Sequence, residues 1–166
     1  GGDGAVIARE LFLKGFYVQV WCPFPIKKTL TNNHLNYLTS IGVTKLVEPP
    51  DANGKELWID AVFGNNQTRK VDNKLITLFN QKFHNKYGKV ISIDIPTGLC
   101  PDKGEPFLDN AVKADYTLAI GLYKIGLTQD SALPFIGELH HIDVGMPTSK
   151  LSKVDKKIFK VTYKDI

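Results

Sequence analysis

Two aspartates and a threonine are the residues of this sequence best placed to do chemistry. Asp60 follows Trp58 and Ile59 inside an apolar stretch, and Asp94 ends another. A carboxylate in such surroundings must be paired, hydrogen-bonded or bound to a metal ion. Thr97 adds a hydroxyl, and hard oxygen ligands select potassium, magnesium or calcium over zinc. The pattern indicates an acid/base group with a bound cation or, as the plainer alternative, aspartates that cap the loops after their strands.

The glycine-rich opening GGDG is a second candidate. Glycines at the start of a helix let backbone N–H groups approach an anion, which the helix dipole favours, and Gly1 and Gly2 suit that task. Asp3 stands where a helix N-cap belongs, so a plain tight turn explains the same residues. Arg69, in the segment GNNQTRK, offers a planar fork that could bind a pyrophosphate.

The elements that would position these residues alternate between strand and helix. Helical patterns cover residues 4–14, ending at Gly15, and then 30–41 and 71–87, whereas strand patterns cover 16–22, 43–47, 57–63, 89–94, 114–121 and 138–145. Nearly continuous apolar strands between helices are typical of a parallel sheet covered on both faces. We predict an α/β fold, a Rossmann-like three-layer α/β/α sandwich with a mostly parallel central sheet. No clear helix separates the last two strands, so the pattern does not decide how the sheet continues at that edge.

This fold predicts where the candidate residues meet. Parallel strands point the same way, so the loops that follow them gather along one edge of the sheet, where ligands bind. The turn at GGDG, Asp60 with residues 64–70, and the DIPTG segment that begins at Asp94 should therefore converge.

Composition favours one compact domain over residues 1–166, since 43% of the 166 residues are hydrophobic. The abrupt start at Gly1 reads as a truncated N-terminus. No apolar stretch approaches the roughly 18 to 20 residues of a membrane span, so no membrane partner is expected. The net charge of +4 belongs to residues 148–166, a basic tail or final edge strand, and nucleic acid is not an expected partner. Cys22 and Cys100 lack metal-site spacing and indicate reduced thiols in an intracellular protein.

Five motifs in order carry a family resemblance: GGDG before a helix, IDAVFG with a downstream arginine, DIPTGL, VKADYTLAIGLYKIGL and GELHHIDVGMP. The chain resembles, over roughly residues 1–147, the YjeF N-terminal domain family, the NAD(P)HX epimerases. The resemblance implies an enzyme that interconverts the R and S epimers of hydrated NADH or NADPH for a partner dehydratase. It also implies a Rossmann-like fold, a potassium ion, a homodimer, and a cytoplasmic or mitochondrial location.

The resemblance also implies roles for individual residues. Asp94 corresponds to the substrate-contacting aspartate, and we assign it as the catalytic acid and base. Asp60 and Thr97 correspond to potassium ligands, while a third ligand, an asparagine, would precede Gly1. Lys124 lies in a loop that matches another family segment and could support the same pocket, with a solvated lysine as the open alternative. The predicted substrate loops contain Gly1, Gly2 and Asp3 in the first, and Gly64, Asn65, Asn66, Gln67, Thr68, Arg69 and Lys70 in the second.

Two departures and one alternative accompany this assignment. Asn66 stands where the family commonly has glycine, and Thr97 replaces a serine but keeps the hydroxyl. The alternative is a binding module without catalysis, for an RNA, a nucleotide or a protein partner. Retention of Asp60, Asp94 and Thr97 favours the enzyme, because a scaffold has no need of all three.

Overall fold

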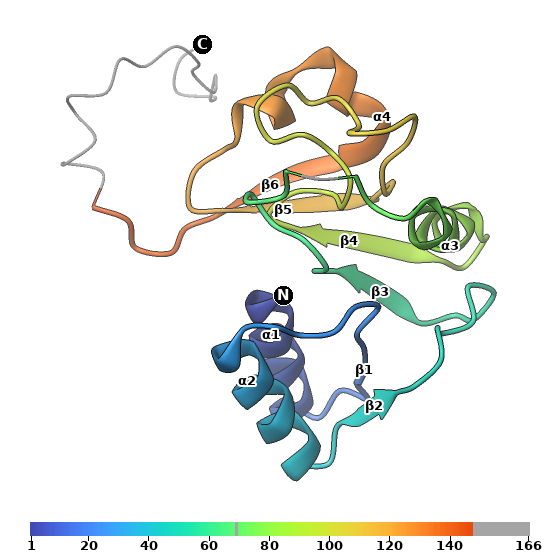
Figure 1. The fold of residues 1–166 in the computed structure, drawn as a ribbon, viewed down its shortest axis with the longest axis vertical. Coiled ribbons are helices and arrows are strands. Elements are labelled where there is room, and N and C mark those ends of the chain that lie inside the picture. Colours follow the sequence, from blue (N-terminus) through green and yellow to red (C-terminus); the bar gives the residue numbers. More distant parts are fainter. Residues whose placement is uncertain (69, 148–166) are drawn as a thin grey trace.

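Parallel strands and short helices alternate along the chain (Figure 1). The computed structural model describes residues 1–68 and 70–147. The elements, in chain order, are α1 (Gly2–Leu13), β1 (Gln19–Trp21), α2 (Thr29–Ser40), β2 (Thr44–Leu46), β3 (Leu57–Asp60), α3 (Asn73–His84), β4 (Lys89–Ile93), β5 (Tyr116–Ile120), the 3₁₀ turns η1 (Ile125–Thr128) and η2 (Asp130–Ala132), α4 (Leu133–Ile136) and β6 (Glu138–Ile142).

All strand pairs among the described residues are parallel, which confirms the predicted α/β class. The strands lie in two sheets, a four-stranded sheet of order β3-β4-β5-β6 and a two-stranded sheet of β1 and β2. In the larger sheet Asp60 lies opposite Ser92, and Ser92 opposite Thr117. Because side chains alternate between faces, these three residues share one face of the sheet.

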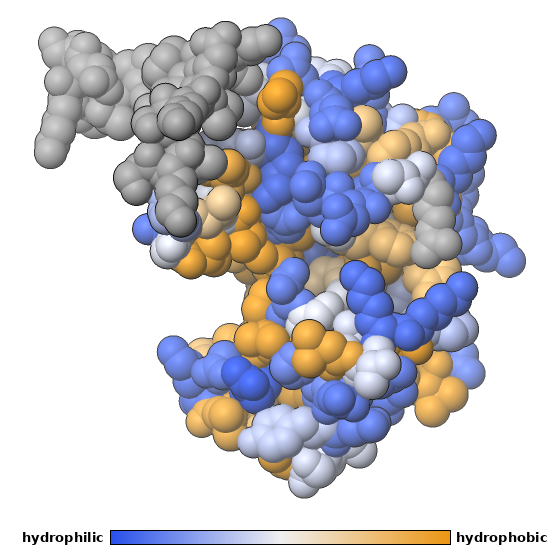
Figure 2. Space-filling view, turned by 60° about the vertical axis from the view of Figure 1, so that its left-hand side comes forward, coloured by the Kyte–Doolittle hydropathy of each residue, from blue (hydrophilic) through white to orange (hydrophobic). Residues whose placement is uncertain are grey.

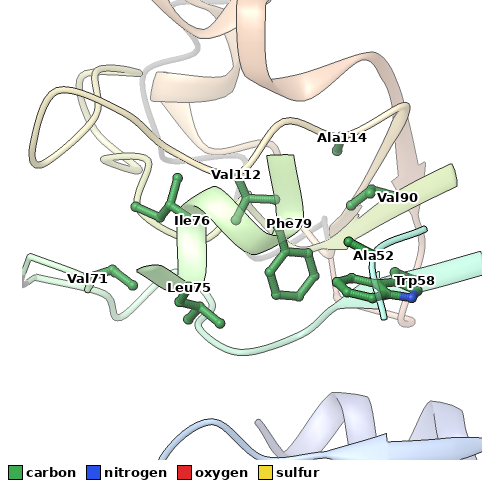
Figure 3. Packing of buried hydrophobic residues seen from close by; sticks show 9 residues of the cluster. All are labelled: Ala52, Trp58, Val71, Leu75, Ile76, Phe79, Val90, Val112 and Ala114. Carbon is green, nitrogen blue, oxygen red and sulfur yellow. The ribbon is translucent and has the colours of Figure 1, made fainter. Parts of the chain in front are cut away.

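Helix α3 covers that face over β3 and β4. The ring of Phe79 meets Trp58 edge to face, with ring centroids 5.4 Å apart, and Leu75 and Val90 pack beside them (Figure 3). Asp72 caps the helix, since its side chain accepts a hydrogen bond from Lys74 N at 2.9 Å. The predicted helix over 71–87 is thus confirmed in its centre, with both ends shorter.

Helices α1 and α2 form a separate layer with β1 and β2 (Figure 1). Their contact buries the small Ala5 and Ala8 of α1 against Leu35 and Leu38 of α2. The molecule is indented between this part and the four-stranded sheet, and hydrophobic surface gathers around the indentation (Figure 2).

The start of α1 differs from the prediction. The helix begins at Gly2 with Gly1 as its N-cap, so Asp3 occupies the first turn and caps nothing. The reason is that Gly1 O already accepts a hydrogen bond from Ala5 N at 3.3 Å, so that helical geometry precedes Asp3. At the other end Gly15, with φ of +87°, makes the predicted left-handed turn.

Two further predictions need correction, one on a strand and one on a helix. β1 covers three residues of the predicted 16–22, and Phe16 and Tyr17 are 58% and 81% exposed where a buried strand was predicted. Between β5 and β6 the chain does form a helix, α4, but four residues are too few for a helical periodicity to be visible in the sequence.

Other expectations fall partly outside the described residues. Cys22 and Cys100 are free, as predicted. No helix within residues 1–68 and 70–147 has the length and hydropathy needed to cross a bilayer. The predicted tail or edge strand over 148–166 lies outside the part that the structure describes.

The junction of α1 with β3 gives a matched pair of variants. A Cβ added at Gly4 would lie 2.7 Å from Ala61 Cβ, whereas one at Gly2 meets nothing closer than Thr31 Oγ1 at 3.8 Å. Both positions are helical, so alanine gains about 0.5–1 kcal/mol of helix propensity at each. We expect Gly2→Ala to leave the free energy of unfolding in urea unchanged or raised, and Gly4→Ala to lower it by about 1–3 kcal/mol through overpacking. Equal stabilities would contradict this close packing.

Candidate active site

Four segments meet at the carboxyl-terminal edge of the strands, the three that the sequence predicts and the loop after β5. The start of α1 touches the residue after β3, since Gly1 N donates to Ala61 O. The loop after β3 reaches the loop after β4 through Phe63 N, which donates to Thr97 Oγ1 at 3.3 Å. The loop after β5 joins them through an ion pair between Lys124 and Asp94. The convergence of GGDG, Asp60 and DIPTG is therefore found.

Asp60 and Thr97 form the buried base of this edge. Both residues have 0% exposure. Asp60 Oδ1 accepts from Thr97 Oγ1 at 2.7 Å and from Val62 N at 3.4 Å, while Oδ2 accepts from Thr97 N at 2.8 Å and Ser92 Oγ at 3.1 Å. Burial raises the pKa of Asp60, and the hydrogen bonds from Thr97, Val62 and Ser92 oppose that rise.

Asp94 lies at the rim, where its side chain is 13% exposed. Its backbone has φ of +72°, the sole non-glycine residue with positive φ among those described. Asp94 N donates to Leu118 O at 2.8 Å, and the carboxylate reaches the loop after β3. There Oδ2 accepts from Asn65 N at 2.9 Å, and Oδ1 accepts from Ile120 N at 3.4 Å and from Lys124 Nζ.

The predicted loop of residues 64–70 is anchored by an interior side chain. Gln67 is buried, its Nε2 donates to Pro96 O at 3.0 Å and Leu99 O at 2.8 Å, and its Oε1 accepts from Gly98 N at 2.9 Å. These contacts hold the loop against the DIPTG segment, so the Gln67 side chain positions the loop. A Cβ on Gly64 would lie 3.3 Å from Asp94 Oδ2, so the absence of a side chain there leaves the carboxylate uncrowded.

The other predicted substrate residues vary in their placement. Asn65, Asn66, Thr68 and Lys70 are exposed on the loop, and Asp3 is exposed on the first turn of α1. Arg69 lies outside the residues that the structure describes. Phe63, Asn66, Gln67 and Thr68 line a cavity of about 280 Å³, while a larger one of about 660 Å³ lies along α3 and contains none of the predicted residues. Asp60, Asp94 and Thr97 line neither of these two cavities. The smaller one adjoins the site, because its lining residues Phe63 and Gln67 are hydrogen-bonded to the loop after β4.

Sequence reasoning missed Ser92 and assigned Gln67 a different role. Ser92 donates to Asp60, and the strand register that pairs them was a usable signal, since both residues lie on one face of neighbouring strands. Gln67 carried no signal of its buried role, because nothing local distinguishes it from the exposed amides beside it. Asp60 and Thr97 are in direct contact, whereas Asp94 is joined to them through the loop of residues 61–65.

Comparison with known proteins gives a consistent picture. A family model described as YjeF-related protein N-terminus matches residues 1–126. A bifunctional NAD(P)H-hydrate repair enzyme Nnr from Synechocystis sp. is 37% identical over 161 residues, which cover 97% of this chain and 30% of the relative. An NAD(P)H-hydrate epimerase from Lentilactobacillus buchneri is 30% identical over 152 residues, covering 88% of this chain and 68% of the relative.

The crystal structure of yeast YNL200c resembles the fold with a TM-score of 0.62 at 19% sequence identity, covering 85% of this chain and 60% of that one. The chain spans about a third of the length of the bifunctional relatives it matches.

Thr97 offers a test of the buried base. Thr97→Val removes the hydroxyl that donates to Asp60 Oδ1 and accepts from Phe63 N, and Asp60 Oδ1 keeps the longer bond from Val62 N. We expect a loss of about 1–3 kcal/mol in the free energy of unfolding, measured by urea denaturation in potassium-free buffer. Thr97→Ser keeps the hydroxyl and should lose less than half as much. A valine variant as stable as the serine variant would show that these hydrogen bonds contribute nothing.

Proposed function

This chain belongs to the family of YjeF-related protein N-termini, and from that membership we propose that it is an NAD(P)H-hydrate epimerase. The substrate would be NADH or NADPH that carries water at C6 of the nicotinamide ring, and the product its other epimer. The observation that carries this proposal is the position of Asp94, a carboxylate fixed at the rim of the sheet above a buried second carboxylate.

The chemistry sets clear demands on the site. The hydrated ring is a hemiaminal, so the ring nitrogen can expel the C6 hydroxyl and leave an iminium, to which water returns on either face. A proton must reach the departing oxygen and another must leave the incoming water. We assign this exchange to the rim of the site, with Asp94 as the charged group that the reaction needs there, because Asn65 N and Ile120 N hold its carboxylate in one orientation.

The glycine-rich turn and the second loop would bind the rest of the substrate. Helix α1 begins at Gly2 beside the end of β3, and its first N–H groups have no acceptor four residues earlier in the helix. A phosphate at this terminus, with Asn65, Asn66 and Thr68 toward the remaining groups, would place the nicotinamide near Asp94. Residues Gly1, Asp3, Gly64, Arg69 and Lys70 complete the proposed substrate set, while the buried Gln67 holds the loop in place instead of contacting substrate.

Asp94→Asn tests the catalytic assignment. Asparagine tolerates the left-handed backbone that position 94 requires, so the fold should survive while the charge is lost. We expect epimerisation of purified single-epimer hydrated NADH, followed by chromatography, to fall at least about 10²-fold. Undiminished turnover would refute the role of Asp94. A wild-type chain that binds the hydrate without converting it would favour the alternative, a binding module.

We also propose that potassium binds at Asp60 and Thr97. The residues fit such an ion, because they present oxygens and because the four donors that meet the buried Asp60 carboxylate are all neutral. A buried carboxylate with a raised pKa gains from a nearby cation. The ion would hold the base of the site in its ionised form, while the proton transfers remain with groups at the rim.

The ion can be tested without activity. A ligand that binds only the folded state stabilises it by about 2.7 kcal/mol at one hundred times its dissociation constant. We therefore expect the melting temperature of the wild-type protein to be higher in potassium chloride than in tetramethylammonium chloride of equal ionic strength, and the difference to vanish in Asp60→Asn. Identical melting temperatures of the wild-type protein in the two salts would exclude the ion.

The proposed setting of the enzyme follows from the same family. We propose that the chain acts within a homodimer, in the cytoplasm or in mitochondria, and that a dehydratase uses the epimer it forms. The bifunctional names of its relatives support the presence of a second activity alongside this one.

A further inference from the structure

The loop that follows β5 is fixed at both ends. At its start Gly121, with φ of +71°, donates from N to Ile142 O at 2.9 Å and accepts at O from His141 Nε2 of β6. At its end Gly126 N donates to Pro101 O at 2.7 Å. A Cβ on Gly126 would lie 2.6 Å from both Gly104 N and Pro101 O, so the chain passes here at the closest approach that glycine allows. The backbone from which a side chain of this loop projects is therefore held in a defined position.

Lys124 projects from this loop to Asp94. Its ammonium donates to Asp94 Oδ1 and, at 2.8 Å, to Ile120 O. The side chain is 12% exposed, nearly the same as its partner. An ammonium carries three N–H groups, so these two contacts aim the side chain and leave a third N–H for another acceptor.

The ion pair between Lys124 and Asp94 suits the two residues to different roles in the reaction. A carboxylate that accepts from an ammonium and two backbone amides is ionised, and an ionised carboxylate has no proton to give. Asp60 and Thr97 are sealed at 0% exposure and bonded to each other. Of the side chains that contact Asp94 among the described residues, Lys124 is the one that holds acidic protons at the rim.

We propose that Lys124 is the proton donor to the departing hydroxyl and that Asp94 stabilises the cation that results, an inference that rests on the proposed epimerase function. Departure of the hydroxyl breaks the C6–O bond, moves one proton from Lys124 Nζ to the oxygen and releases water. The ring nitrogen supplies the electron pair of the new C=N bond. Positive charge thereby passes from the ammonium to the ring, beside an Asp94 carboxylate whose charge is no longer balanced by Lys124.

The return step restores the protons and charges that the first step moved. Water adds to C6 from either face, the C=N pair goes back to the ring nitrogen, and the water proton goes to the neutral Lys124 amine. Charge and proton count at the end equal those at the start, with no oxidant, reductant or further reactant. Lys124 would thus be a catalytic residue in both directions.

Two substitutions distinguish a proton donor from a positioning partner. Lys124→Arg keeps the charge and the ion pair with Asp94, but a guanidinium does not give up its proton in proteins. Lys124→Met removes both charge and proton. We expect both variants to lower kcat for epimerisation of hydrated NADH by about 10²- to 10⁴-fold, with KM changed by less than about fivefold. The exposed Lys103→Met is the matched control, with wild-type rates expected.

Chemical rescue gives a second, independent measurement. Ethylamine should restore turnover of Lys124→Ala in proportion to its concentration, because a free amine can deliver the missing proton. An arginine variant within threefold of the wild-type rate would overturn the proposal in favour of positioning by charge, as would an alanine variant that no amine restores. Failure of the wild-type protein to epimerise would instead remove the proposed function and this inference together. Should the methionine variant not fold, as judged by circular dichroism, the arginine variant alone decides.

Discussion

The rest of the site depends on one buried carboxylate finding its hydrogen-bond donors. Asp60 has no access to water, so its oxygens must be satisfied by the protein itself. The donors come from the next turn of its own chain, from the neighbouring strand β4 and from the loop that follows β4. The hydrogen bonds to the Asp60 carboxylate therefore fix the positions of the loops that follow β3 and β4. These two loops carry residues at the rim of the site. Gln67 adds a second link between the same two loops.

The site has two levels with different electrostatic character. The lower level consists of Asp60 and Thr97, which are fully buried, and the donors that bond to the Asp60 carboxylate are neutral. The upper level, Asp94 with Lys124, is partly open to solvent and internally neutral as an ion pair. A largely buried pair contributes little net stability, because the cost of desolvating the two charges offsets their attraction. In the proposed mechanism the pair serves reactivity, since a charge that moves from lysine to substrate needs a fixed counter-charge beside it.

The sequence was sufficient to locate this edge but not to describe it. Strand patterns that end at Asp60 and Asp94 predicted convergence, because parallel strands leave no other place for their following loops. Element limits failed where short-range geometry decides: the cap at Gly1 in place of Asp3, the exposed Phe16 and Tyr17 ahead of β1, and the four-residue α4. The buried role of Gln67 and the reach of Lys124 depend on contacts between residues about thirty positions apart, for which a single sequence holds no local signal.

Under the proposed function, the left-handed backbone at Asp94 sets function and stability against each other at this position. Glycine would occupy that conformation without steric penalty, whereas a residue with a Cβ costs about 1–2 kcal/mol there, a cost that aspartate lessens through local hydrogen bonds. The protein thus keeps a carboxylate at a point where its backbone would be more relaxed without one. Under the proposed function, selection for thermal stability that replaces Asp94 by glycine would give variants that fold better and lack activity.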